Sequence, residues 1–265
     1  MLYLSVIIPS YKGEKRISKT LLAVDHYLTK QHYDYEILVV NDGSPDKTAE
    51  VVASFEQMIH NLRLIDNKEN HGKGWVVRKG MLEAQGDYRV FMDDDNATTI
   101  DHIEKAWPYF KEGYDVVIGT RDSRDHKDAK QAVPQSFLKR ALGDIGNILI
   151  QILAVWGIWD TQCGFKAFSA KAAKEIFSRG LIDRFGFDIE VLAVAKRLGY
   201  KIAKIPIYWI NDSSSTVNLK SYLKTFVELF QIKMNLLTDK YHLRSPKSAE
   251  SNEPKVEQHQ NKKIV

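Results

Sequence analysis

Short runs of aliphatic and β-branched residues alternate with longer helical stretches through the first 120 residues of the chain. The strand-like runs lie at 4–9, 36–40, 62–65, 88–92 and 115–120. Strands separated by helices of this length pair in parallel through right-handed crossovers. We therefore expect an α/β fold with a mainly parallel sheet flanked by helices. In such sheets, ligands bind beyond the carboxyl ends of the strands.

The sequence also predicts where the helices lie. In the first half they cover about 14–30, 46–60 and 75–84, and one more precedes the fifth strand. The second half shows a long apolar helix that reaches 159, helices at 170–178, 187–198 and 217–237, and a last strand at 201–210. The last of these helices has apolar residues at helical spacing, which is typical of an amphipathic helix.

The composition fits one globular body. Of the 265 residues 44% are apolar, enough for a sizeable core. The 38 cationic residues face 34 acidic ones, and a net charge of +4 argues against a nucleic-acid partner. The single cysteine excludes a disulfide framework and a cysteine-rich zinc module. We expect a packed domain over 1–238 and a disordered polar tail over 239–265.

Three aspartates, Asp93, Asp94 and Asp95, directly follow the fourth predicted strand. Adjacent carboxylates repel one another, so burying them together is costly without a cation. In an extended segment Asp93 and Asp95 point to the same side and Asp94 points away. Hard divalent cations such as Mg²⁺ prefer oxygen ligands, so the pattern predicts a metal site at Asp93 and Asp95. A solvated acidic loop is the alternative.

Two turns rich in glycine and one arginine also lie at strand ends or helix starts. The segment 41–44 (NDGS) follows the second strand, and 70–74 (NHGKG) precedes the third helix. Both fit ordinary turns. Asp42 could also accept hydrogen bonds from a base or a ribose, and Lys73 beside two glycines suits an anion. Arg121 could reach a diphosphate or pair with a neighbouring aspartate. The spacings of a P-loop and of a dinucleotide fingerprint are absent, which argues against both classes.

Together, the segments VIIPSY at 6–11, NDGS at 41–44, GKG at 72–74 and DDD at 93–95 resemble the inverting family 2 glycosyltransferases of GT-A fold. The segments DTQCGFK at 160–166 and FDIE at 187–190 are similar to the dolichyl-phosphate β-glucosyltransferase branch, close to the dolichyl-phosphate mannose synthases. The resemblance covers about residues 4–237, and DTQCGFK is its most specific part. It implies a Rossmann-like nucleotide-sugar-binding fold with C-terminal helices near the acceptor and the membrane. It also implies an enzyme that moves glucose from UDP-glucose to a polyprenyl phosphate with inversion.

The resemblance assigns roles to single residues. It implies that Asp93 and Asp95 hold Mg²⁺ or Mn²⁺, and that Arg121 and Asp188 complete the catalytic set. The residues it places at the nucleotide-sugar are Pro9, Tyr11, Glu14, Asp42, Lys73 and Asp94. It places Gln162 and Lys166 at the sugar and the acceptor phosphate.

The chain departs from the family pattern where family members usually have Asn-Glu-Glu after Tyr11. Here Lys12-Gly13-Glu14 stands, so Gly13 takes the place of the usual glutamate, and whether Glu14 substitutes for it stays open. Two alternatives stay open: a family 2 transferase that uses GDP-mannose or a UDP-N-acetylhexosamine, and a catalytically silent subunit that binds a nucleotide-sugar. Ala97 argues against the mannose branch, which often has glutamine there.

An apolar stretch at 145–159 fits the lipid acceptor that the resemblance implies. It is shorter than the ~20 residues that cross a bilayer. It follows a loop, 121–140, with six basic and three acidic residues, and it ends near Trp156 and Trp159. Basic residues and tryptophans are typical of a helix on a membrane surface, although a core helix fits as well. We expect a peripheral protein on the cytoplasmic face of a membrane.

Overall fold

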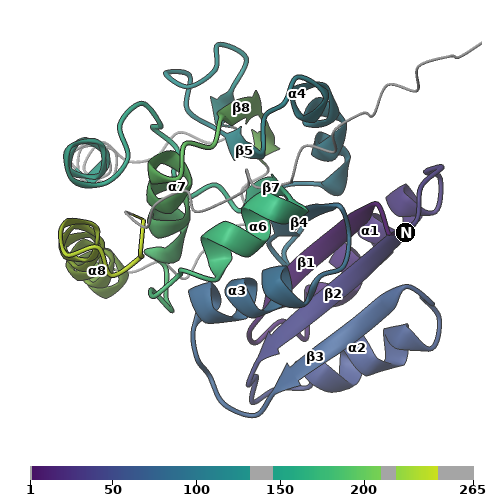
Figure 1. Ribbon diagram of the computed structural model, residues 1–265. Coiled ribbons are helices and arrows are strands. Elements are labelled where there is room, and N and C mark those ends of the chain that lie inside the picture. Colours follow the sequence, from purple (N-terminus) through teal and green to yellow (C-terminus); the bar gives the residue numbers. More distant parts are fainter. Residues whose placement is uncertain (1, 132–145, 210–218, 244–265) are drawn as a thin grey trace, which may run out of the picture.

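The computed structural model of the protein describes residues 2–131, 146–209 and 219–243. Within these residues a seven-stranded sheet in the order β3-β2-β1-β4-β7-β5-β8 forms the centre of the molecule (Figure 1). Its strands are β1 (Leu4–Ser10), β2 (Tyr35–Asp42), β3 (Leu62–Asn67), β4 (Tyr88–Met92), β5 (Val116–Thr120), β7 (Phe165–Ser169) and β8 (Ile202–Pro206). A two-stranded ribbon pairs β6 (Lys130–Gln131) with β9 (Tyr208–Trp209).

The strand directions bring most of the loops that carry motifs to one edge of the sheet. Strands β1 to β4 run parallel, as the spacing predicts. Strand β7 is inserted antiparallel between β4 and β5, so β5 and β8 run in the same direction as the first four. Met92, the last residue of β4, pairs with Phe165, the first of β7. The start of β7 therefore lies beside the aspartates that follow β4.

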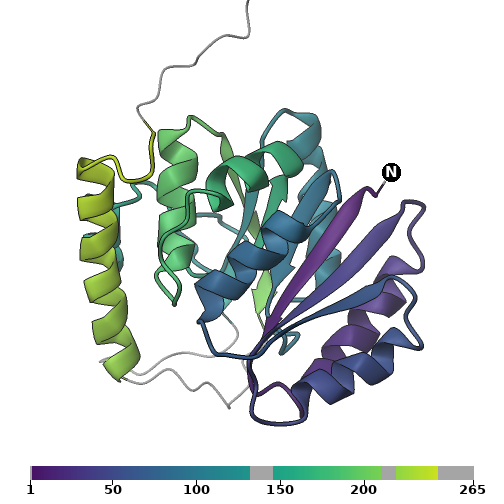
Figure 2. The same ribbon diagram turned by 60° about the horizontal axis from the view of Figure 1, so that its bottom comes forward.

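Helices cover both faces of the sheet (Figure 2). They are α1 (Ile17–Leu28), α2 (Thr48–Glu56), α3 (Lys73–Glu83), α4 (Trp107–Lys111), α6 (Ala170–Phe177), α7 (Phe187–Arg197) and α8 (Leu219–Leu237), with a 3₁₀-helix η1 (Ile100–Lys105) before α4. Along β1, Leu4, Val6 and Ile8 pack into the core beneath α1 and α2, while Ile7 packs into the core beneath α3, α6 and α7. The period of two along a strand thus supplies apolar side chains to both layers.

The long apolar helix ends earlier than the sequence indicates. The structure is helical at 146–153 and turns at 154–160, so Trp156 and Trp159 lie beyond the helix. The side chain of Gln151 stabilises this end: its amide donates to the carbonyl of Ile158 (2.5 Å) and accepts from the backbone N–H of Gly157 (2.6 Å). Trp156 is 74% exposed, whereas the ring of Trp159 packs against the Arg124 guanidinium. Residues 132–145, which include part of the predicted basic loop, lie outside the described residues.

The described body continues past residue 238. Tyr241 is fully buried and donates from its hydroxyl to Glu190 of α7 (2.8 Å), so the first residues of the expected tail pack against the domain. Residues 244–265 lie outside the described part, and disorder there stays a prediction. None of the described helices is both long enough and apolar enough to span a membrane.

Candidate active site

Asp93 follows β4 and lies between a lysine and the backbone of β7. Its Oδ1 accepts a hydrogen bond from the Lys73 ammonium at 2.5 Å. A Cβ atom on Gly164 would lie only 2.0 Å from Asp93 Oδ2, so the carboxylate rests directly against the Gly164 backbone. This contact explains the glycine of the DTQCGFK segment. Burial alone would lower the pKa of Lys73, but Asp93 and Asp188 outweigh burial and raise it.

Asp95 leaves the sheet edge in a tight turn. Its Oδ1 accepts from the backbone N–H of Ala97 (2.9 Å), and Asn96 between them adopts a left-handed backbone with φ of 54°. Burial raises the pKa of Asp95, and the neighbouring charges of Asp93 and Asp94 add to the rise. A nearby cation would stabilise the ionised form of this carboxylate.

Asp93 and Asp95 offer a donor set that fits Mg²⁺ or Mn²⁺. Both ions prefer hard oxygen ligands, and Mg²⁺ usually takes one or two protein carboxylates together with substrate phosphates. The amide oxygen of Asn96 is buried without a hydrogen-bond partner among the described residues, so one further oxygen of this loop has no partner. No cluster of three His, Cys, Asp or Glu side chains able to hold a metal occurs in the described parts of the chain. Two carboxylates of one loop suit an ion that takes its other ligands from a substrate phosphate.

Asp94 contacts β1 and the loop after it, whereas Asp93 contacts Lys73. That Asp93 and Asp95 point to the same side stays a prediction. The Asp94 side chain is 9% exposed and accepts from the Ser10 hydroxyl (2.5 Å) and from Nε of Arg16 (2.7 Å). Both carboxylate oxygens thus have partners within the protein. The contact of Asp94 with a nucleotide-sugar stays a prediction, and neither Ser10 nor Arg16 was among the residues that the motifs point to.

The loops after β1 and β2 hold each other at the same sheet edge. Gly13 N–H donates to the Thr48 hydroxyl (2.8 Å), and Lys12 N–H donates to Ser44 (3.0 Å). Glu14 lies at the start of α2, where its carboxylate accepts from Lys47 N–H (3.4 Å). Tyr11 is 40% exposed beside them, whereas Pro9 is buried within β1. Tyr11 is therefore the best exposed of the side chains predicted to meet the nucleotide.

Asp42 organises the loop that carries Lys73. Its carboxylate accepts from the backbone N–H groups of His71 (2.7 Å) and Gly72 (3.0 Å) and from the Asn70 amide (2.8 Å). It is 3% exposed, so its main observed role is to fix residues 70–72 at the start of α3. A direct contact with the base or ribose stays a prediction.

Gly72 and Gly74 are required by packing within the protein. A Cβ atom at Gly72 would lie 2.5 Å from the carbonyl oxygen of Asp183, and one at Gly74 would lie 2.5 Å from that of Ile182. Gly72 also has φ of 107°, a region that residues with a side chain rarely adopt. The glycines let this loop pack closely against 182–184 and thereby place Lys73 next to Asp93.

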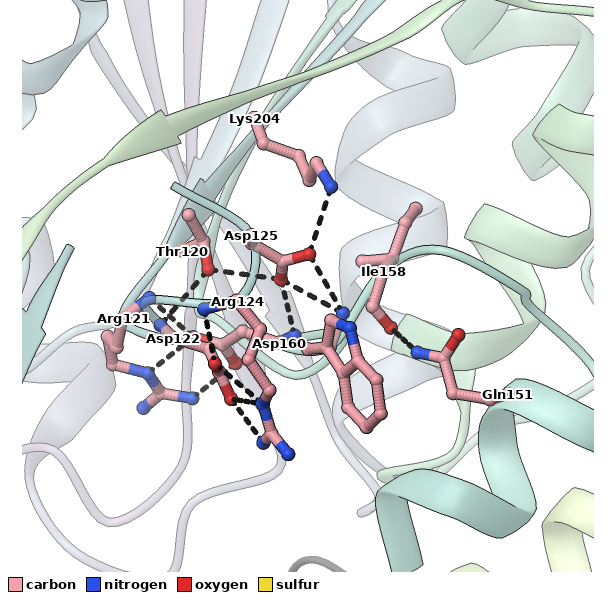
Figure 3. A network of polar contacts seen from close by, with 10 residues as sticks. Thr120, Arg121, Asp122, Arg124, Asp125, Gln151, Ile158, Asp160 and Lys204 are labelled. Atoms are coloured by element: carbon pink, nitrogen blue, oxygen red, sulfur yellow. Dashed lines mark hydrogen bonds and ion pairs between the residues drawn. The ribbon is translucent and has the colours of Figure 1, made fainter. Parts of the chain in front are cut away.

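Arg121 is held by Asp160 in a two-pronged ion pair (Figure 3). Nε and Nη2 of Arg121 each lie 2.8 Å from a different oxygen of Asp160. Burial would lower the pKa of Arg121 and raise that of Asp160, but their attraction outweighs both effects, so the pKa of Arg121 is raised and that of Asp160 lowered. The sequence left a diphosphate and a neighbouring aspartate open as the partner of Arg121, and Asp160 comes from 39 residues further along the chain.

Asp125 holds the segment that carries Asp160. Its fully buried carboxylate accepts from the backbone N–H groups of Trp159 (2.9 Å) and Asp160 (2.8 Å) and from the Lys204 ammonium (3.0 Å) (Figure 3). Nothing in the local sequence distinguishes Asp125 from the other charges of this loop. Its role depends on the turn at 154–160, which sequence periodicity does not predict.

Lys166 and Asp188 form an ion pair deep inside the protein. Their side chains are 0% and 6% exposed, and the Lys166 ammonium lies 2.5 Å from Asp188 Oδ1 and 2.6 Å from the carbonyl of Cys163. Burial raises the pKa of Asp188, against the opposing effect of Lys166 and Lys73. Gln162, by contrast, is exposed. Of the two residues predicted at the sugar and acceptor, only Gln162 lies at the surface.

The sequence profile described as Glycosyl transferase family 2 matches residues 5–177, more than half of the chain. The chain belongs to glycosyl transferase family 2. This confirms the resemblance, and the sheet with its flanking helices is the GT-A fold of these glycosyltransferases.

The similarity to curated relatives covers most of the chain. A dolichyl-phosphate beta-glucosyltransferase of Trichomonas vaginalis is 36% identical over 242 residues, which cover 87% of this chain and 72% of the relative. The human protein of the same name is 32% identical over 257 residues, or 91% of this chain and 78% of the relative. These alignments include the segments 160–166 and 187–190 that pointed to this branch.

Solved structures share the fold at low sequence identity. Mannosyl-3-phosphoglycerate synthase from Rubrobacter xylanophilus superposes with a TM-score of 0.66 at 18% identity, covering 94% of this chain and 79% of that one. Glucosyl-3-phosphoglycerate synthase from Mycobacterium tuberculosis in complex with UDP gives 0.65 at 17% identity, covering 88% and 80%. Another structure of the mycobacterial enzyme contains Mn²⁺ and UDP-glucose.

Proposed function

We propose that the protein transfers glucose from UDP-glucose to a polyprenyl phosphate of the dolichyl type, with inversion at the anomeric carbon. The observation that carries this proposal is the position of Gly164. The segment most specific to the branch, DTQCGFK, starts β7 and lies against the Asp93 carboxylate, so it contributes directly to the catalytic edge. Relatives that align over most of the chain carry the name dolichyl-phosphate beta-glucosyltransferase.

The chemistry of such a transfer suits the charges at this edge. An oxygen of the acceptor phosphate attacks the anomeric carbon, and the bond to the diphosphate breaks with the electron pair leaving on UDP. The acceptor is already anionic at neutral pH, so positioning contributes more than a strong base. Lys73 would contact the departing diphosphate. Arg121, locked by Asp160, would present a fixed positive charge there.

Asp93 and Asp95 would hold Mg²⁺ or Mn²⁺, which when bound offsets the negative charge that grows on the departing diphosphate. The Lys73 ammonium partly neutralises Asp93. Asp188 is buried in its pair with Lys166, so we assign it an orienting role beneath β7 rather than proton transfer. Gln162 would lie near the sugar from its exposed position.

We also propose a peripheral contact with the cytoplasmic side of a lipid bilayer, and an apolar surface near the C-terminus supports the contact itself. Val227, Phe230, Met234 and Leu237 are spaced by three or four residues on one face of α8 and are each more than half exposed. The helix at 146–153 lies beside α8 (Figure 1), since Gly146 is close to the Phe226 ring. That helix adds Ile148 and Ile152 to the exposed surface, and Trp156 follows it. Apolar and aromatic residues so exposed mark a binding surface.

A donor screen tests the proposed reaction. The protein is incubated with a short polyprenyl phosphate and UDP-glucose, GDP-mannose or UDP-N-acetylglucosamine, with and without a chelator. We expect glucosyl lipid from UDP-glucose alone, its loss with chelator and its return with manganese. Transfer of another sugar, or activity that survives replacement of both Asp93 and Asp95 by Asn, would contradict the proposal.

Vesicle flotation tests the membrane contact separately. Phe230→Glu and Met234→Glu should each lower binding to anionic vesicles that contain polyprenyl phosphate by about tenfold, because a charge replaces an apolar side chain worth about 1.5–3 kcal/mol when buried. Met58→Glu is the matched control, since Met58 is 64% exposed but follows α2 on the opposite side of the molecule (Figure 1). Equal flotation of all three variants would contradict this surface.

A further inference from the structure

The loop after β1 and the loop after β4 are joined by a side-chain network that no motif reveals. We call residues 11–16 the β1 loop and residues 93–97 the β4 loop. Arg16 at the end of the β1 loop donates from Nε to Asp94 Oδ1 at 2.7 Å. Its other two nitrogens donate to the carbonyls of Tyr11 (2.9 Å) and Lys12 (3.0 Å). One guanidinium therefore closes the β1 loop upon itself and ties it to the β4 loop.

Asp94 is anchored from several directions. Besides Arg16, the Ser10 hydroxyl donates to its Oδ2 at 2.5 Å, and the Thr20 hydroxyl of α1 donates to its backbone carbonyl at 2.7 Å. The peptide between Asp93 and Asp95 is thus fixed through both its side chain and its main chain. Because Asp94 lies between Asp93 and Asp95 in the chain, anchoring it limits the movement of both neighbours.

The space around Gly13 leaves no room for a side chain. A Cβ atom built on Gly13 would lie 2.7 Å from Asp94 Oδ2 and 2.2 Å from the Ser10 hydroxyl. The backbone of Gly13 does not lie in the left-handed region, so space rather than conformation excludes a side chain here. The Asp94 carboxylate and a side chain at position 13 therefore compete for one volume.

We propose that Asp94 and Arg16 form a positioning strut between the β1 loop and the β4 loop, which holds Asp93 and Asp95 in the arrangement that receives the metal and diphosphate of the donor. The strut rests on the proposed function, because it orders the same site. The carboxylate of Asp94 fills the place that a longer side chain at position 13 would otherwise take. Without the strut, the β4 loop has to be ordered during binding, and each extra residue to be ordered costs about tenfold in affinity.

Calorimetric titration of UDP with manganese measures the strut independently of catalysis. We expect Asp94→Asn and Arg16→Gln to raise the Kd of UDP with manganese about tenfold. Arg63→Gln is the control, because Arg63 pairs with Glu83 (3.1 Å) at similar exposure, away from the site, and should leave Kd within about twofold. In steady-state assays, the KM for UDP-glucose should rise in the strut variants while that for the acceptor stays within about twofold.

A rescue experiment separates positioning from general damage. Gly13→Glu should abolish UDP binding, because its Cβ meets Asp94 and Ser10. Combining Gly13→Glu with Asp94→Ala removes the competing carboxylate and frees the Ser10 hydroxyl to rotate, so the Kd should return to that of Asp94→Asn, about tenfold above the wild type. Thermal melts identify any variant that has lost its fold.

The outcomes are distinguishable. Strut variants that bind UDP with manganese as tightly as Arg63→Gln would overturn the strut and leave the proposed function standing. A double variant that binds no better than Gly13→Glu would also overturn it. If the wild type itself fails to bind UDP with manganese, the proposed function is contradicted, and the role of the strut with it.

Discussion

Gly164→Ala adds one methyl group at a position where the structure leaves no room for it. The new Cβ would lie 2.0 Å from Asp93 Oδ2 and 2.6 Å from Asp93 Cγ, whereas ordinary contact begins at 3.4 Å. The strand β7 is paired on both sides and does not yield easily, so the Asp93 carboxylate has to withdraw by more than about 1 Å. A displacement of this size in a reacting group costs about 100-fold in rate.

The effect on folding should be small, because Asp93 is 37% exposed and can turn towards solvent. We expect kcat/KM for glucosyl transfer to fall about 100-fold while the free energy of unfolding falls by about 1 kcal/mol or less. Gly113→Ala serves as the control. Its Cβ meets nothing within 4 Å, but its φ of 81° strains any other residue, so it should lose about 1–2 kcal/mol of stability and keep its activity. Equal activity of the two variants would refute the assigned position of Asp93.

Three further predictions follow from buried groups. Burial lowers the pKa of His102, whose Nε2 accepts from Tyr208 N–H (3.0 Å), so the unfolded chain takes up the proton first as the pH falls below about 6.5. The free energy of unfolding should therefore decrease below that pH, and it should decrease less in His102→Gln. Urea denaturation at several pH values measures this, and the same pH dependence in the wild type and the variant would contradict the prediction. Lys166→Met leaves Asp188 buried without its partner and should lower the free energy of unfolding by about 3–5 kcal/mol, whereas the double variant with Asp188→Leu should lower it less. Chemical denaturation that ranks the two variants in the opposite order would argue against the buried pair. Burial raises the pKa of Cys163 to about 12, so this thiol should stay unmodified by a thiol reagent until denaturant is added; rapid labelling of the folded protein would disagree.

Much of the fold could be predicted because its strands are continuous aliphatic runs. The run at 88–92 coincides with β4, and the other predicted strands of the first half differ from the observed ones by one to three residues at their ends. Strand β7 was missed. It has five residues, includes Lys166, and pairs antiparallel with strands far away along the chain. Nothing in local periodicity distinguishes such an inserted strand from a loop.

The sequence predicts where the candidate site lies but not which side chains contact one another there. The position of the aspartates after β4 follows from the strand pattern. The partners could not be predicted, because Asp160 meets Arg121 across 39 residues and Arg16 meets Asp94 across 78. Lys166 was predicted at the sugar and the acceptor phosphate, and only the structure shows that its ammonium pairs with Asp188 in the interior.

Anomalous diffraction from crystals soaked with manganese and UDP tests the central claim most directly. We expect one manganese peak in contact with carboxylate oxygens of Asp93 and Asp95 and with the diphosphate of UDP, with the Lys73 ammonium moved from Asp93 towards a phosphate oxygen. UDP bound at this sheet edge without a peak at these two aspartates, or a peak elsewhere in the protein, would contradict the account.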